Sequence, residues 1–190
     1  MQSQYQTHSS PVSSPLHASG NTTLYYLSIC NQLPSVKSLV GTTENSEYTL
    51  FPGVRLVIQL VLMYHMRISE VLDIRVKDEV KPTVFLVRAR KRGVNYCIHI
   101  PVDSRNRSIL LSCDPGQRLF PFSYHWVWRC MVRAGMSMRV TTRVNRVVTH
   151  RGRFDLAGKL QRLNDISNIT PLLHHKSTKT RDYYLPGAPK

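Results

Sequence analysis

The sequence predicts an α+β fold, mainly α-helical, with a small antiparallel three-stranded sheet. Apolar residues repeat at helical spacing between residues 52 and 66, and again between residues 123 and 135. Between these segments, residues 74–100 contain short β-branched runs separated by turn residues. The chain has 190 residues, of which 42% are hydrophobic, and this suffices for one domain with a sizeable core.

The N-terminal quarter is the most polar part of the chain. Residues 1–20 are rich in Gln, Ser, His and Pro, lack the apolar core of a signal peptide, and are expected to be disordered. Thr23–Leu33 is the first segment able to bury side chains, as a short helix, and a Ser- and Thr-rich loop follows to Glu47. We therefore predict a polar, flexible segment and linker over residues 1–47 and a folded domain over residues 48–190.

The first long helix begins at Pro52, because proline is favoured in the first turn of a helix. It is expected to end near Met66, so that Arg67 lies at a helix junction. A second short helix follows, with Ser69 and Glu70 predicted to be exposed. The apolar positions that define the two helices are Val54, Val57, Ile58, Val61 and Leu62 in the first and Ile68, Val71 and Leu72 in the second.

Three strands are predicted after these helices, at Ile74–Val76, Thr83–Val87 and Val94–Ile100. Pro82 separates the first from the second, and Lys91-Arg92-Gly93 supplies the turn of a hairpin between the second and third. Residues 103–118 are mostly polar and are expected to be a connection.

Ser123 is the predicted N-cap of a later helix that ends at Gly135. One side of this helix is an aromatic stripe that we expect to join the core. Its other side holds His125, Arg129 and Arg133, which could contact backbone phosphates. Further basic residues continue toward His150, namely Arg139, Arg143 and Arg146.

Charge limits the choice of partner. There are 26 Lys and Arg against 11 Asp and Glu, a net charge of +15 with a pI near 10.2. Such a protein is expected to bind a polyanion. Nucleic acid is the favoured interpretation, and the alternatives are an acidic membrane surface or a basic protein without a polyanionic partner. The longest apolar run, residues 54–63, is about half of the ~20 residues that span a bilayer. No metal site is expected, because the cysteines lack metal-ligand spacing: Cys30, Cys97, Cys113 and Cys130.

Two pairs near the C-terminus suggest phosphate chemistry. His150 and Arg153 are three apart and share a face if helical, and Tyr184 follows His175 by nine residues. Cleaving a phosphodiester without a metal needs a nucleophile, cations on the non-bridging oxygens, and an acid for the leaving oxygen. Tyrosine can be the nucleophile, and arginine suits the oxygens because its planar fork donates bidentately.

With these residues in place, the chain resembles the catalytic domain of the tyrosine recombinases, the phage integrase family, over about residues 50–185. The resemblance depends on order and spacing rather than on any one motif. Its parts are Arg67 in RISEVL, a lysine on a hairpin turn, LFP followed by a helix and AG, H-x-x-R at His150 and Arg153, LLHH at Leu172–His175, and Tyr184.

The resemblance implies a role for each matching residue. Arg67 and Arg153 would clamp the scissile phosphate, and His150 and His175 would hydrogen-bond it and assist proton movement. Tyr184 would attack to give a 3′-phosphotyrosine. No cofactor is implied.

Two supporting roles are also implied. Lys91 would protonate the leaving 5′ oxygen, and Glu70 would buttress the site. Arginines elsewhere would contact the DNA: Arg90, Arg92, Arg129, Arg133, Arg143 and Arg146.

The implied partners are double-stranded DNA, three further copies of the chain in a tetramer on paired sites, and accessory DNA-bending proteins, in the cytoplasm at the nucleoid. With only about 50 mostly polar residues before the catalytic part, the chain resembles the short members of the family, such as the fimbrial phase-inversion recombinases.

Several alternatives stay open. Either His174 or His175 could face the phosphate, and Tyr183 competes with Tyr184 as nucleophile. The chain could also be a catalytically degenerate DNA-binding or regulatory relative, a type IB topoisomerase-like nicking enzyme, or an unrelated basic RNA-binding protein. Neither the DNA site nor the outcome, whether integration, excision, inversion or resolution, follows from the sequence.

Overall fold

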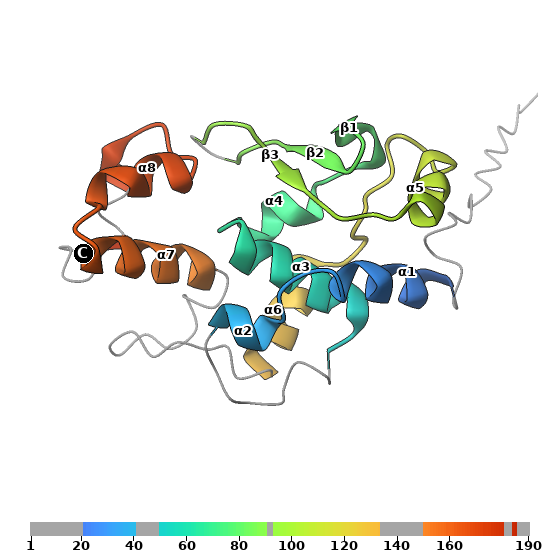
Figure 1. Ribbon diagram of the computed structural model, residues 1–190, viewed down its shortest axis with the longest axis horizontal. Helices are drawn as coiled ribbons and strands as arrows, with labels where there is room; N and C mark the ends of the chain where they lie inside the picture. Colours follow the sequence, from blue (N-terminus) through green and yellow to red (C-terminus); the bar gives the residue numbers. More distant parts are fainter. Residues whose placement is uncertain (1–20, 41–49, 91–92, 134–149, 181–183, 186–190) are drawn as a thin grey trace, which may run out of the picture.

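The computed structural model describes residues 21–40, 50–90, 93–133, 150–180 and 184–185 (Figure 1). The predicted class is confirmed: the fold is α+β and mainly helical, with one three-stranded antiparallel sheet. The helices are α1 (Asn21–Cys30), α2 (Val36–Val40), α3 (Pro52–Met63), α4 (Ile68–Leu72), α5 (Ser104–Leu111), α6 (Tyr124–Arg133), α7 (Arg151–Arg162) and α8 (Ile169–Leu172), and the strands are β1 (Glu79–Lys81), β2 (Val84–Val87) and β3 (Tyr96–His99).

Helix α3 is the centre of the main core. Pro52 occupies its first turn, as predicted, and almost every later residue up to Leu62 is buried. Helices α1, α2, α4, α6 and α7 all pack against it. The helix ends at Met63 rather than near Met66, because His65 adopts a left-handed backbone conformation with φ of 53°.

The folded region extends N-terminally of residue 48. Tyr26 and Ile29 of α1 are buried in the same core as α3, and α2 forms where a loop was predicted. The Gln59 amide in α3 donates to the carbonyls of Cys30, 3.1 Å away, and Pro34, 3.0 Å away. These bonds fasten α1 and the segment before α2 to the core.

The sheet has the order β1-β2-β3 with antiparallel pairing throughout. The hairpin of β2 and β3 confirms the prediction, with Phe85 opposite Ile98. The predicted strand at Ile74–Val76 is wrong. Its backbone pairs instead with a later segment, since Val76 N donates to the Gln117 carbonyl at 3.0 Å, and the strand that pairs with β2 begins at Glu79.

Residues 103–118 are not merely a connection, because they contain helix α5. The Asp103 carboxylate accepts a hydrogen bond from Asn106 N at 2.8 Å and caps the helix. The mostly polar composition of the segment hid this N-cap from the sequence analysis. The Asn106 amide also donates to Ser28 Oγ at 2.6 Å, which ties α5 to α1.

Helix α6 is capped as predicted, by Ser123 Oγ, which accepts from Trp126 N at 3.2 Å. Val127 and Met131 are buried, and Trp126 and Trp128 pack half-buried against the core. The aromatic stripe therefore serves mainly as core, and the predicted end of this helix lies outside the described residues.

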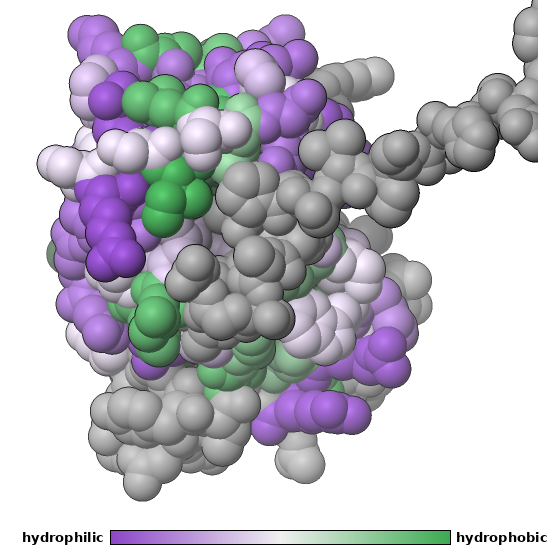
Figure 2. Space-filling view, turned by 90° about the vertical axis from the view of Figure 1, so that its right-hand side faces the viewer, coloured by the Kyte–Doolittle hydropathy of each residue, from purple (hydrophilic) through white to green (hydrophobic). Residues whose placement is uncertain are grey.

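The surface of the described residues is mixed in polarity. At the α1–α5 end of the molecule, the coloured part of the face in Figure 2 alternates hydrophilic groups with smaller apolar ones. Leu24 and Leu111 are the most exposed apolar residues of α1 and α5. None of the helices in the described part of the chain is long and apolar enough to cross a bilayer.

A second, smaller core joins the C-terminal elements. Ala157 and Leu160 of α7 pack with Ile169 and Leu173 and with the ring of Tyr184. This cluster brings the end of the described chain back onto α7, as Figure 1 shows.

Gly152 allows α7 to lie directly against α3. A Cβ at this position would come within 2.9 Å of the Val61 carbonyl oxygen and 3.2 Å of Leu62 Cα, which are backbone atoms of α3. We expect Gly152→Ala to lower the free energy of unfolding by about 1–3 kcal/mol in urea titrations, as overpacking does. Gly158→Ala, in the same helix, is the control: its Cβ would meet nothing within 4 Å, so it should stabilise by up to ~1 kcal/mol. Equal effects of the two substitutions would contradict this prediction.

Candidate active site

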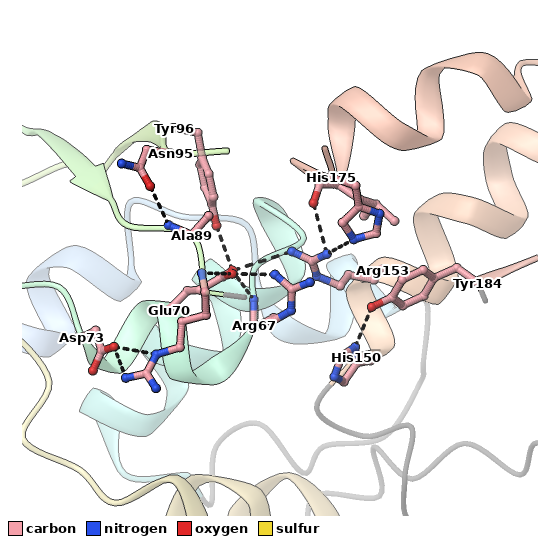
Figure 3. A network of polar contacts seen from close by, with 12 residues as sticks. Arg67, Glu70, Asp73, Ala89, Asn95, Tyr96, His150, Arg153, His175 and Tyr184 are labelled. Carbon is pink, nitrogen blue, oxygen red and sulfur yellow. Dashed lines mark hydrogen bonds and ion pairs between the residues drawn. The ribbon is translucent and has the colours of Figure 1, made fainter. Parts of the chain in front are cut away.

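Four parts of the chain meet at one buried polar cluster, drawn in Figure 3. The α3–α4 junction contributes Arg67 and Glu70, and the start of α7 contributes His150 and Arg153. His175 follows α8, and Tyr184 comes from the end of the described chain. Five of the six predicted catalytic residues are thus brought together: Arg67, His150, Arg153, His175 and Tyr184.

Glu70 lies at the centre of the cluster and is 1% exposed, so the prediction that it is exposed is wrong. Arg67 bonds it twice, through its backbone N at 3.0 Å and its Nη1 at 2.6 Å. Arg90 N and the Tyr96 hydroxyl, each at 3.2 Å, also donate to it, and Arg153 Nη2 lies 3.6 Å away. A buried carboxylate requires such partners, which come from distant parts of the chain and could not be inferred from helical spacing.

Glu70 is ionised in this setting. Burial alone raises its pKa, but the hydrogen bonds and positive charge of Arg67, with the charge of Arg153, lower the pKa overall. Two guanidinium groups thus surround one carboxylate, and the cluster retains a net positive charge.

Arg153 is fully buried. Its Nη1 donates to the Leu173 carbonyl at 3.1 Å and to His175 Nε2 at 2.9 Å. Its Nε and Nη2 atoms are buried and have no hydrogen-bond partner among the described residues. Burial and the nearby charge of Arg67 lower its pKa, yet arginine stays protonated in proteins. Donors without a hydrogen bond on a permanent buried cation suit an anion with several oxygens.

His175 is neutral in this cluster. Burial, together with the charges of Arg153 and Arg67, lowers its pKa to about 4. Because Arg153 can only donate, His175 Nε2 accepts, and the ring proton is on Nδ1. That Nδ1 is buried without a partner among the described residues. Of the two adjacent histidines, it is His175 that contacts Arg153, while His174 stacks on Tyr96.

Tyr184 is 3% exposed and lies among aromatic rings. Its hydroxyl is 2.9 Å from His150 Nδ1. The rings of His175 and Phe154 lie 5.6 and 5.0 Å from its own, between centroids. A tyrosine hydroxyl in contact with an imidazole can pass its proton to that ring. Tyr183 lies outside the described residues.

The β2–β3 hairpin borders the cluster. Gly93 bridges to His175, and Val94 N donates to the His174 carbonyl at 3.0 Å. A Cβ at Gly93 would lie 2.6 Å from that of Ala89, so the turn needs glycine there. Lys91 and Arg92 lie outside the described residues.

Exposed arginines lie on two other surfaces. Arg129 and Arg133 are exposed on α6, whereas Arg143 and Arg146 fall outside the described residues. Arg90 pairs with Asp73 and borders a cavity of about 280 Å³ next to Glu70. The other charged residues that line it, which sequence reasoning missed, are Arg75, Arg88, Arg118 and Asp78. Their separation along the chain left no sequence signal.

The described residues include no group of three or more His, Cys, Asp and Glu side chains placed to hold a metal ion. Cys30 and Cys113 are buried, Cys130 is half-buried and Cys97 is exposed, and no disulfide joins any two of these four cysteines.

The neutrality of His175 predicts a pH dependence of stability. Between pH 6.5 and about 4 the unfolded chain binds a proton at this residue that the folded protein does not. The free energy of unfolding should therefore fall as the pH drops through this window, by on the order of 2–3 kcal/mol from this group. Urea titrations from pH 7 to 4 should show a shallower dependence for His175→Gln, and an unchanged slope would contradict the prediction. Burial also lowers the pKa values of His65 and His174, so the free energy of unfolding of His175→Gln should still depend on pH, but less steeply.

No family model matches the sequence, and the search of curated proteins finds no match.

Proposed function

We propose that this protein is a site-specific DNA recombinase of the tyrosine recombinase type, which cleaves and rejoins DNA strands through a covalent 3′-phosphotyrosine. The observation that supports this most is the placement of Tyr184. Its hydroxyl contacts His150, 34 positions earlier, beside the buried Arg153, whose Nε and Nη2 make no hydrogen bond among the described residues. A nucleophile, a proton acceptor and an oxyanion-binding cation occupy one site.

The proposed step is an in-line displacement at phosphorus. The Tyr184 oxygen forms a bond to phosphorus as the bond from phosphorus to the 5′ oxygen breaks, and the tyrosine proton passes to His150. Lys91, from the hairpin turn, supplies the proton that the leaving 5′ oxygen takes. One phosphoester bond forms as another breaks, so the bond energy is kept in the phosphotyrosine. A 5′-hydroxyl of another strand can therefore reverse the step without ATP.

The two arginines stabilise the charge that develops on the non-bridging oxygens. The carboxylate of Glu70 orients Arg67 by bonding both its backbone and its side chain. Nη1 of Arg153 is held by the Leu173 carbonyl and His175, and its Nε and Nη2, which make no hydrogen bond among the described residues, would donate to the phosphate. Groups fixed before the reaction stabilise a transition state more than groups that must reorganise.

Double-stranded DNA is the proposed partner, and four copies on paired sites would supply one nucleophile for each strand exchanged. Accessory DNA-bending proteins and a place in the cytoplasm at the nucleoid belong to the same proposal. The net charge of +15 supports a polyanionic partner.

The arginines of α6 predict how the affinity for DNA depends on salt. Replacing Arg129 and Arg133 by Gln should weaken binding for all sequences and make the slope of log K against log salt shallower by about 2. Fluorescence anisotropy at several salt concentrations measures this. Arg105→Gln is the control, since this exposed residue belongs to α5, at the end of the molecule away from α7 (Figure 1). An unchanged slope in the double variant would exclude α6 from the interface.

The activity is tested with a nicked suicide DNA substrate, or a pool of flanking DNA when the site is unknown. Incubation in EDTA and denaturing electrophoresis should reveal a covalent protein–DNA adduct, and the attached strand should resist an exonuclease that enters from its 3′ end. Salt-sensitive binding to a verified site without any adduct would reject the recombinase and favour a DNA-binding relative without the chemistry.

A further inference from the structure

His174 has an unusual backbone. Its φ is 55°, in the left-handed region that glycine adopts freely and that residues with a Cβ adopt at an energetic cost. This conformation turns the chain directly before His175, the histidine that contacts Arg153. Something must therefore offset the cost of the turn.

The ring of Tyr96 supplies this compensation. It lies flat on the His174 imidazole, with centroids 3.5 Å apart and planes inclined by 7°. The backbone next to Tyr96 adds a second attachment, because Val94 N donates to the His174 carbonyl at 3.0 Å. The left-handed turn is thus held on its side chain by Tyr96, the first residue of β3, and on its carbonyl by Val94, two residues before it.

Tyr96 also contacts the other side of the cluster. Its hydroxyl donates to Glu70 Oε2 at 3.2 Å, and Glu70 in turn pairs with Arg67 and lies 3.6 Å from Arg153 Nη2. Burial and the nearby Glu70 carboxylate raise the pKa of Tyr96, so it stays a neutral donor. The Tyr96 side chain thus connects His174, which precedes His175, with the Glu70 carboxylate, which orients both arginines. Figure 3 shows the contact between the Tyr96 hydroxyl and Glu70.

We propose that Tyr96 is a positioning residue of the phosphate site, which holds His174 in its left-handed turn by ring stacking and Glu70 by its hydroxyl. In terms of catalysis this rests on the proposed recombinase function. Tyr96 does not itself touch the reacting atoms. It acts through His175 and through the two arginines. Its ring stabilises the left-handed turn of His174, and a glycine at position 174 would adopt that turn without such a partner.

A double-mutant cycle separates this role from general stability. Tyr96→Ala should slow adduct formation on the suicide substrate by about 10- to 100-fold at saturating DNA, with the Kd for DNA unchanged within about twofold. His174→Gly should recover most of that loss in the Tyr96→Ala background, because glycine adopts the turn without a stacking partner. Tyr96→Phe keeps the ring and should lose less than Tyr96→Ala.

The control is Tyr64→Phe, which removes a tyrosine hydrogen bond of similar kind, to the His99 carbonyl at 2.7 Å, away from the cluster. It should leave adduct formation unchanged. Circular dichroism and urea titration of each variant identify any that fail to fold, and Tyr96→Phe keeps the test decisive if Tyr96→Ala is one of them.

NMR titration of the His175 ring provides a readout that does not need activity. In Tyr96→Ala its pKa, about 4 in the wild type, should move toward 6.5 as its burial and its contact with Arg153 are reduced, and Tyr64→Phe should not change it. An unchanged His175 titration, or additive losses for Tyr96→Ala and His174→Gly, would overturn the positioning role. If the wild type forms no adduct, the proposed function fails, while the titration still decides whether Tyr96 positions His175.

Discussion

Tyr184→Phe is expected to abolish the covalent protein–DNA adduct, reducing its formation by at least ~10³-fold, because the phenyl ring has no oxygen to attack phosphorus. The ring itself should still fill its place among His150, His175 and Phe154. The hydroxyl contact with His150, 2.9 Å long, is lost. The measurement is adduct formation on the nicked suicide substrate, with wild type and variant at equal occupancy of the DNA.

Tyr183→Phe is the matched control, one residue away and equal in chemistry, and it should keep the adduct. The Kd for DNA of Tyr184→Phe should stay within about twofold of wild type, since the hydroxyl is buried and the electrostatic contribution to binding is unchanged. An adduct that survives Tyr184→Phe but disappears with Tyr183→Phe would transfer the nucleophile to the neighbouring tyrosine. An adduct that survives both would reject the phosphotyrosine chemistry.

Arg153→Lys is expected to slow adduct formation by on the order of 10²- to 10³-fold while preserving the charge. Arg153 donates from Nη1 to the Leu173 carbonyl and to His175, and its Nε and Nη2 make no hydrogen bond among the described residues. A lysine ammonium is a point charge that cannot reproduce this planar fork. Single-turnover rates at saturating DNA measure the loss without a contribution from binding.

Arg162→Lys is the control for Arg153→Lys, because Arg162 is exposed at the last turn of the same helix. Its rate should match wild type. If Arg153→Lys also matched wild type, the buried guanidinium would serve folding alone, and the clamp on the scissile phosphate would have to be assigned elsewhere. Thermal unfolding of both variants shows whether any rate loss reflects a fraction of unfolded protein.

The candidate site could be predicted in part because its residues have informative types and spacings. Arginine, histidine and tyrosine in this order indicate phosphate chemistry, and five of them do converge in the structure. What the spacing could not supply was the environment. Glu70 looked like a surface residue of a short helix, yet it is the buried carboxylate of the cluster. Tyr96 looked like an ordinary strand residue, yet it touches both Glu70 and His174.

Local patterns were sufficient for elements whose stability signals lie within them. The helix from Pro52, the hairpin around Gly93 and the cap at Ser123 were recognisable from periodicity, turn chemistry and capping, which act over a few residues. Tertiary packing decided the rest. It paired the backbone of Val76 with Gln117 and so moved the first strand to Glu79, because a strand needs a partner and partners are chosen by packing between distant segments. It also buried Glu70 and turned His175 rather than His174 toward Arg153, since desolvation and charge pairing depend on which distant side chains meet.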